Sequence, residues 1–221
     1  ERRAISSTFH ASSVEFPSEG RVRLIYDFDE QEEDLLLDWT PPIEKTNRRI
    51  RWSKSLEGTW STVERAIVIA DLGVWLHKGV WKEDVRMEID YLSMSGTRSG
   101  DLCAVVYAYD KGKRLVGSNF GKQCVRLSKS LKLSGKPIPL KPWPMAAVED
   151  RFTFGIKLEG GVLYSLRNGY SKADTAEKPK FLKKLSVGRV GIAFRGRVNG
   201  FIFKITIEGV PDPEWLKKRA S

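Results

Sequence analysis

The chain has 221 residues, 41% of them hydrophobic and 10% aromatic, which is enough to bury the core of one sizeable domain. Its formal charge is +10, from 38 basic and 28 acidic residues. No apolar run approaches the about 18 residues that a membrane-spanning helix needs, and no signal-peptide pattern opens the chain. Because the chain starts at Glu1, we expect it to be a segment of a larger protein.

The histidines and cysteines are too few for several kinds of site. Only His10 and His77 are present, so a histidine-based metal site or a Ser-His-Asp triad has little material. Cys103 and Cys124 are 21 residues apart, a spacing that fits no zinc or redox motif. The sequence leaves open either a disulfide between neighbouring strands or two buried thiols.

Short alternating segments separated by turn residues predict strands along the first two thirds of the chain. Apolar and polar residues alternate in "RVRLIYDF" (21–28) and again in "VRMEIDYL" (85–92). The continuous apolar run "RAIVIAD" (65–71) is typical of a strand buried on both faces. The segment "DLCAVVYAYDKGKRLVGSNF" (101–120) predicts a hairpin that turns at residues 110–113.

The last third begins with a break in this pattern. "SGKPIPLKPWPMAAVED" (134–150) holds four prolines, which exclude a central strand and predict a long surface connection. Further strand-like segments follow, with hairpin turns expected at Gly160-Gly161 and Asn168-Gly169. "YSKADTAEKPKFLKKL" (170–185) is polar and lysine-rich and predicts a loop or a short helix. At the end of the chain, Asp212-Pro213 predicts the N-cap and first position of a short helix or turn.

About a dozen strands with one hydrophobic system predict an all-β fold, a two-sheet antiparallel jelly-roll sandwich with a short C-terminal helix or turn. A closed barrel is the competing architecture. We expect an N-terminal extension or linker at 1–19, a single sandwich domain at 20–216 and a C-terminal tail at 217–221.

The C-terminal segment "GRVGIAFRGRVNGFIFKITIEGVPDPEWLKKR" (188–219) resembles the closing strands of concanavalin A-like lectin/glucanase sandwiches, the group that includes laminin G-like domains. Upstream, "DFDEQEEDLLLDW" (27–39) and "EDVRMEIDYLSM" (83–94) are similar to the opening of such domains in bacterial extracytoplasmic proteins. The resemblance covers residues 20–216. It implies carbohydrate recognition, protein recognition or glycoside hydrolysis, and it favours an extracellular or periplasmic location. The fold itself does not decide among these activities.

The strand at 85–92 carries two carboxylates, Glu88 and Asp90, on one face. Laminarinase-type glucanases of the resembled fold carry Glu-x-Asp-x-Glu, or a form one residue longer, and the last Glu is the acid/base. Here Leu92 or Ser93 occupies that place, and neither can transfer a proton usefully. We therefore predict no catalytic residue. Glu88 and Asp90 are candidate ligand contacts, or else solvated residues paired with bases such as Arg86.

Aromatic side chains are the second group of candidates, because sugars stack on exposed rings. We expect most of the seven tryptophans to be in the core. Trp143, between two prolines, is the best candidate for an exposed ring. Trp75 and Trp81, in a stretch expected to be loop-like, come next, and Tyr170 is a candidate rim residue.

Charge is distributed unevenly. Residues 111–141 contain nine bases and no acid, whereas residues 27–38 contain seven acids and no base. Lys129 and Lys132 are therefore candidate contacts for an anionic glycan; nucleic acid ranks lower, because no RNA-binding signature is present. A solvated face that balances the acidic segment is the alternative. The acidic segment leaves Ca²⁺ open as a cofactor, although it lacks a calcium-loop spacing.

Taken together, the sequence predicts a non-catalytic module with a basic surface that recognises a carbohydrate, neutral or anionic, or a protein partner. No metal ligands are predicted. A sugar-acting hydrolase of the same fold and a structural or assembly domain with buried tryptophans are the alternatives.

Overall fold

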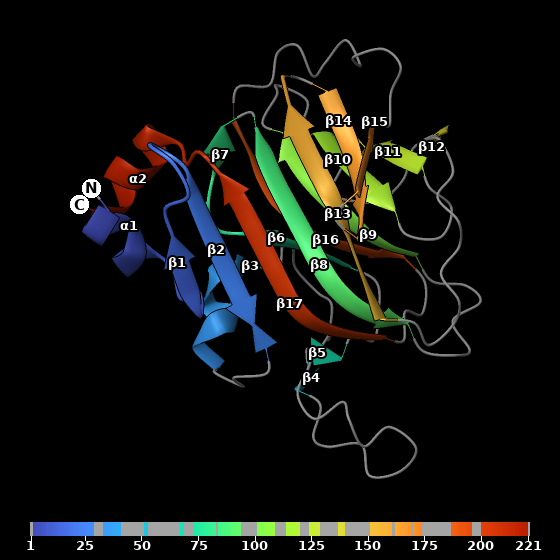
Figure 1. The fold of residues 1–221 in the computed structure, drawn as a ribbon, viewed down its shortest axis with the longest axis horizontal. Coiled ribbons are helices and arrows are strands. Elements are labelled where there is room, and N and C mark those ends of the chain that lie inside the picture. Colours follow the sequence, from blue (N-terminus) through green and yellow to red (C-terminus); the bar gives the residue numbers. More distant parts are fainter. Residues whose placement is uncertain are drawn as a thin grey trace.

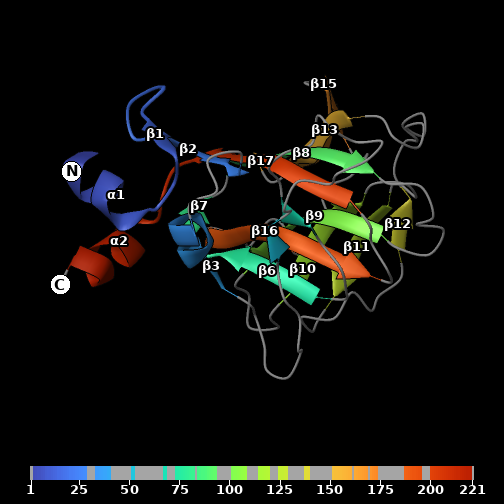
Figure 2. The same ribbon diagram turned by 90° about the horizontal axis from the view of Figure 1, so that it is seen from below.

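A computed structural model describes residues 2–28, 33–40, 51–52, 67–68, 73–82, 84–93, 101–108, 114–119, 124–128, 137–139, 151–160, 162–168, 170–173, 187–195 and 200–220. Two antiparallel sheets lie one over the other as the layers of a sandwich (Figures 1 and 2). The predicted two-sheet architecture is thus confirmed, and a single closed barrel is not formed.

Sheet A has its strands in the order β1-β2-β17-β8-β13-β14-β15, and two short strands, β4 and β5, pair at one end of β17. Every pairing between its neighbouring strands is antiparallel. The strands are β1 (Ser13–Glu15), β2 (Val22–Asp27), β4 (Arg51–Trp52), β5 (Ile67–Val68), β8 (Val85–Ser93), β13 (Arg151–Glu159), β14 (Val162–Arg167), β15 (Tyr170–Ala173) and β17 (Gly200–Gly209).

Sheet B has its strands in the order β12-β11-β10-β9-β16-β6-β3, and β7 pairs with the start of β16. The strands are β3 (Trp39–Thr40), β6 (Gly73–His77), β7 (Trp81–Lys82), β9 (Asp101–Ala108), β10 (Arg114–Asn119), β11 (Cys124–Ser128), β12 (Pro137–Pro139) and β16 (Val187–Arg195). A 3₁₀ helix at Glu33–Asp38 leads into β3.

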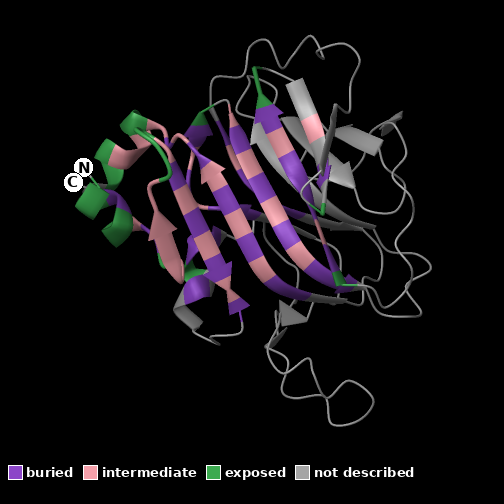
Figure 3. Cartoon of the chain, in the orientation of Figure 1, coloured by how far each residue is buried: buried purple, intermediate pink, exposed green. Residues whose placement is uncertain are grey.

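The core lies between the sheets and follows the alternation in the sequence. Buried and half-buried residues alternate along β2, β17, β8 and β13 (Figure 3). From sheet A, the apolar faces of β8 and β17 contribute Ile89 and Ile207, and from sheet B β16 contributes Val190 and Ile192; all four are fully buried. One set of alternating apolar positions on each sheet is therefore enough to close the sandwich.

The predicted hairpins are present. Residues 103–108 of β9 pair antiparallel with residues 114–119 of β10. β14 and β15 form a tight hairpin, since Arg167 pairs with Tyr170 and Asn168 follows Arg167 as a turn residue. Asn168 has φ +47°, the left-handed conformation that this short turn requires and that asparagine tolerates. In the proline-rich segment, β12 pairs with β11 at the edge of sheet B, where proline is allowed.

Two parts of the structure differ from the prediction, and a third prediction is not tested. Residues 170–173 form a strand, β15, although the polar, lysine-rich composition of 170–185 predicted a loop or a short helix. The loop-like stretch around Trp75 and Trp81 contains β6 and β7. The expected burial of 65–71 lies outside the described side chains, and only β5 is described there.

The chain ends form a pair of short helices at one end of the sandwich, α1 (Arg2–Thr8) and α2 (Pro213–Ala220) (Figures 1 and 2). Asp212 caps α2 as predicted: its Oδ1 accepts hydrogen bonds from the backbone N–H groups of Glu214 and Trp215, at 2.8 and 3.4 Å. The N-terminal segment, expected to be an extension or linker, contributes Ile5 and Phe9 to the core, where both are only 6% exposed.

The two cysteines occupy strands that are not neighbours. Cys103 on β9 pairs with Asn119 of β10, and β10 separates β9 from β11, which starts at Cys124. Two strand spacings put their Cα atoms about 10 Å apart, beyond the about 7 Å that a disulfide spans. In these described strands, Cys103 and Cys124 are therefore not bonded to each other.

The packing of the N-terminal segment can be tested at Phe9, whose ring stacks on Trp81 and Trp215 with centroids 6.2 and 5.8 Å away. We expect Phe9→Ala to lower the free energy of unfolding by about 3 kcal/mol, because it leaves a cavity beside two indoles. The measurement is urea denaturation. Ser7→Ala, an exposed change in the same helix, is the control and should cost less than about 0.5 kcal/mol. Equal effects would mean that this segment is a linker.

Candidate functional site

The outward surface of sheet A carries a continuous set of charged and hydroxyl side chains. These residues alternate with the core positions of β2, β17, β8 and β13, and the register brings them side by side. We call this surface the polar face; it consists of Arg23, Asp27, Arg86, Glu88, Asp90, Arg151, Thr153, Lys157, Lys204, Thr206 and Glu208. All are half-buried except Arg151, which is exposed. The pink bands across the front strands in Figure 3 mark most of them.

Ion pairs join the strands across the polar face. Arg23 contacts Glu208 at 2.9 Å and Glu15 at 3.1 Å, and the hydrogen bond with Glu208 is the main reason that the pKa of Arg23 is raised. Lys204 contacts Asp27 at 2.9 Å. Cations and carboxylates thus alternate from β1 to β13, which makes the face strongly polar with its charges locally balanced.

Glu88 and Asp90 lie in the middle of this face, as the strand pattern predicts. Oε2 of Glu88 contacts Arg86 at 2.8 Å, and Asp90 accepts two parallel hydrogen bonds from Arg151 at 2.6 and 3.0 Å. Leu92, at the position of the missing third carboxylate, is 6% exposed. Both acids are therefore held by arginines, and the strand offers no further group that could carry a proton.

The side chains around Glu88 are short. Its neighbours across the strands are Gly155 on β13 and Thr206 on β17, while Asp90 is next to Thr153. A Cβ at Gly155 would overlap the Met87 carbonyl, so the close approach of β13 to β8 requires glycine there. As a result, the side chains at the centre of the polar face are short, and longer side chains such as Lys157 surround them.

Sequence reasoning missed an irregularity beside Asp90. Simple alternation along β17 would point Phe203 into the core with Ile205, but the register shifts between Ile202 and Lys204. Phe203 instead lies under Arg151, whose guanidinium carbon is 4.0 Å from the ring centroid. The bulge therefore gives the polar face an aromatic ring, only 4% exposed, beneath a cation.

A second polar group is buried where α1 meets both sheets. The carboxylate of Asp38, fully buried, accepts hydrogen bonds from the Tyr26 hydroxyl at 2.6 Å and from the His10 backbone N–H at 2.7 Å, and it pairs with Lys78. Burial by itself would raise the pKa of Asp38, but the bonds from Lys78, Tyr26 and His10 outweigh it and lower the pKa below 3.8. Burial, together with Asp38, raises the pKa of Tyr26 well above 10. Asp38 is thus an internal anion with a full set of donors.

His77 completes this network from sheet B. Its Nδ1 accepts the N–H of Gly79 at 3.0 Å, so the proton of the neutral ring is on Nε2, which donates to the Tyr26 oxygen at 2.7 Å. A Cβ at Gly79 would lie 2.9 Å from the ring, so only glycine allows this bond without a shift. The ring is fully buried, and burial is the main cause that lowers its pKa to about 3. His77 is therefore a neutral structural residue between Tyr26 and Gly79.

The other predicted site residues fall in different places. Trp81 is 1% exposed, and its buried indole N–H has no hydrogen-bond partner, so its ring belongs to the core. Trp75 is on β6 and Tyr170 starts the edge strand β15, but their side chains lie outside the described part. Trp143, Lys129 and Lys132 are outside the described residues.

Metal binding was considered for the acidic segment 27–38. Asp27 contacts Lys204 and Asp38 belongs to the buried network, while residues 29–32 lie outside the described part. Within the described ranges, no three His, Cys, Asp or Glu residues gather as a metal site would require. Neither described helix has the length and hydropathy of a transmembrane span.

Comparisons with known proteins give similarity in structure alone. No protein-family model matches the chain, and no curated protein matches its sequence. Among solved structures, the cellulose-induced protein Cip1 is similar with a TM-score of 0.56 and 10% identity, over 83% of this chain and 96% of that one. A structure described as a native glycosidic hydrolase has a TM-score of 0.54 and 10% identity, over 84% and 94%.

The Crh5 transglycosylase in complex with NAG is similar with a TM-score of 0.52 and 11% identity, over 85% of this chain and 83% of that one. At such identities the similarity establishes a shared fold. The chain is a two-sheet antiparallel β-sandwich, the fold that it shares with these proteins.

The buried network predicts the effect of removing one hydroxyl. Tyr26→Phe deprives Asp38 of a donor and His77 of an acceptor, so we expect the free energy of unfolding to fall by about 2 kcal/mol. Urea denaturation measures this. Tyr164→Phe, which removes a half-buried hydroxyl on β14, is the matched control and should cost less than about 0.5 kcal/mol. A Tyr26→Phe protein as stable as the wild type would contradict the network.

The low pKa of His77 predicts a dependence of stability on pH. Its pKa is about 3 in the folded protein and ordinarily 6.5. As pH falls below 6.5, the unfolded chain binds a proton that the folded protein excludes, so stability decreases towards pH 3 by at most about 1.4 kcal/mol per pH unit. The pKa of Asp38 is lowered from 3.8, so Asp38 loses its contribution only below that pH.

Urea denaturation between pH 6.5 and 5 tests His77, because ordinary carboxyl groups titrate mainly below this range. His77→Gln should be less stable overall but should show a smaller decrease across this range than the wild type. Ser7→Ala, an exposed change that removes no titratable group, should retain the wild-type slope. The prediction fails if His77→Gln and the wild type have the same slope.

Proposed function

We propose that the chain is a non-catalytic carbohydrate-binding module whose polar face binds neutral glycans. Solved proteins that share its fold include a glycosidic hydrolase and a transglycosylase in complex with NAG, so glycans are the ligand class to test first. The observation that supports a site on this chain is that fixed charged groups surround the short side chains at the centre of the polar face.

Glu88 is the central contact in this proposal. Its Oε2 is bound to Arg86, whereas its Oε1 has no partner among the described residues and is available as an acceptor. Gly155 and Thr206 on either side leave room for a ring above it. Hydrogen bonds from sugar hydroxyls to an ionised acceptor held in place are stronger than bonds to neutral groups.

Asp90, Arg151 and Phe203 supply a second contact next to Glu88. The Arg151 guanidinium is fixed both by Asp90 and by the Phe203 ring below it, so little side-chain entropy is lost when it donates to a ligand. Since the charges of the face are paired, it suits hydroxyl-rich neutral ligands better than polyanions. Trp143, a stacking candidate from sequence, stays part of the proposal.

The same geometry supports binding without hydrolysis. Retaining hydrolysis requires a carboxylic acid that protonates the leaving oxygen and a second carboxylate about 5–5.5 Å from it. On β8, Glu88 and Asp90 are each paired with an arginine, and position 92, where the third carboxylate would be, is leucine. Ligands would therefore be held intact.

A glycan array with neutral and acidic glycans tests the proposal. We expect binding of neutral glycans that changes little with salt and is weakened about tenfold or more by Glu88→Gln with Asp90→Asn, because each change removes a charged hydrogen-bond partner. Glu159→Gln at the end of β13 is the control for the same chemical change and should retain binding. Prolonged incubation should release no reducing ends.

Three results would contradict this proposal. Failure to bind any glycan would leave a protein-interaction or structural module as the better interpretation. Loss of binding in Trp143→Ala, with full binding in the Glu88 and Asp90 variant, would move the site to the proline-rich segment. Release of sugar would identify the chain as a hydrolase.

A further inference from the structure

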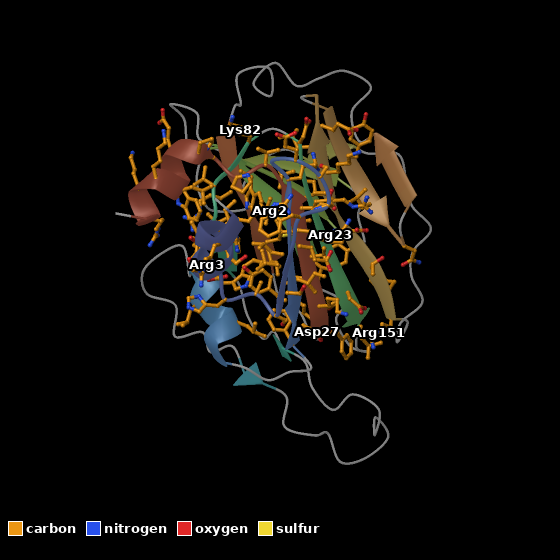
Figure 4. All side chains as sticks on the ribbon, turned by 60° about the vertical axis from the view of Figure 1, so that its left-hand side comes forward. Arg2, Arg3, Arg23, Asp27, Lys82 and Arg151 are labelled. Atoms are coloured by element: carbon orange, nitrogen blue, oxygen red, sulfur yellow. The ribbon has the colours of Figure 1, made fainter. Side chains whose placement is uncertain are left out.

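The helix pair at the chain ends differs in charge from the polar face, where cations and carboxylates are paired. Half of its exposed side chains are basic and one, Glu214, is acidic; Figure 4 looks onto this end of the molecule, with Arg2, Arg3 and Lys82 labelled. We call it the terminal basic surface; it consists of Arg2, Arg3, Lys82, Lys217, Lys218 and Arg219. The acids nearest in the sequence are Glu1 before Arg2, Glu83 and Asp84 after Lys82, and Asp212, which caps α2, with Glu214.

The helices α1 and α2 and the strand β7 bring these bases together. α1 and α2 contact each other, and the backbone N–H of Lys82 donates to the Val210 carbonyl, just before α2, at 2.9 Å. Phe9 stacks on Trp215 beneath the two helices, which fixes their positions. The cations are therefore carried by a rigid end of the sandwich although they come from both ends of the sequence.

Five of the six bases of this surface, all but Lys218, are not balanced as those of the polar face are. Within the described part of the chain, Arg2, Arg3, Lys82, Lys217 and Arg219 form no ion pair, whereas the arginines of the polar face are paired at 2.6–3.1 Å. Arg2 and Arg3 are also in the first turn of α1, where the helix dipole disfavours cations. A bound polyanion would relieve the repulsion that these bases exert on one another.

The side chains around the bases indicate what kind of polyanion fits. α1 exposes Ala4, Ser6 and Ser7 beside its arginines, which gives small and hydroxyl groups but no large apolar group to enter a lipid bilayer. Trp215 is covered by Phe9 and by Arg219, which lies 5.8 Å from the ring centroid, so it offers no open ring for a nucleobase. Cations with hydroxyls suit an acidic polysaccharide.

We infer that the terminal basic surface is a second ligand site, which binds sulfated or carboxylated glycan chains across α1 and α2. The inference rests on the proposed function only in preferring a glycan to other polyanions. Because this surface does not share residues with the polar face, neutral glycans report on the polar face and acidic glycans on the helix pair.

Heparin and polygalacturonate, with neutral dextran as the reference, are the probes, and affinity is measured calorimetrically at low and at physiological ionic strength. We expect binding of at least one acidic chain that weakens with salt, and no salt-dependent binding of dextran. Arg3→Ser with Lys217→Ser removes one cation from each helix without touching the rings. It should weaken binding about tenfold and reduce the salt dependence.

The charge-conserving variant Arg3→Lys with Lys217→Arg should restore binding, and thermal unfolding should show that both double variants are folded. Three outcomes would overturn the inference: no acidic glycan binds; the serine variant binds as the wild type does, while Lys129→Ser with Lys132→Ser loses binding; or a DNA duplex or phosphatidylserine vesicles bind as tightly as the glycans at the same ionic strength. Neutral-glycan binding that fails separately would contradict the polar-face proposal alone.

Discussion

The buried carboxylate of Asp38 is the constraint on which the arrangement of this sandwich depends. A carboxylate removed from water is costly unless donors surround it, and its donors come from separate parts of the chain: His10 after α1, Tyr26 on sheet A and Lys78 after β6 of sheet B. Satisfying one anion therefore joins the N-terminal segment to both sheets. The aromatic rings of Phe9 and His77 stack over the same place and exclude water from it.

This junction also determines how the surfaces of the molecule differ. With α1 held against the sandwich by Phe9, the bases of the two terminal helices are gathered at one end. On sheet A, by contrast, strand register sets each cation beside a carboxylate, as in the pairs of Arg23 with Glu208 and of Arg151 with Asp90. One chain with an excess of bases thus has a balanced face and an unbalanced end, and these surfaces suit neutral and anionic ligands respectively.

Comparison of Glu88 with Asp38 shows why the same residue class has different roles in this fold. Both carboxylates contact basic groups, but Asp38 is fully buried, with every donor supplied by the protein, whereas the Glu88 side chain is 22% exposed and keeps one oxygen for an outside partner. The first is suited to stability and the second to recognition. Phe203 is intermediate: a bulge moves its ring out of the core, yet Arg151 covers it.

The sequence by itself determined the features that depend on neighbouring residues. Alternation predicted the strands at 21–28 and 85–92 and the outward direction of Glu88 and Asp90, and the cap at Asp212 and the turn at Asn168-Gly169 followed from local backbone chemistry. Only the tertiary structure decided which groups surround Asp38, that β10 separates the two cysteines, and that Phe203 leaves the core. These features depend on strand register and on contacts between residues far apart in the chain, which local periodicity does not report. The helix α1 went unpredicted for the same reason: seven residues make a stable helix only when Ile5, and Phe9 just after it, are buried against the sandwich.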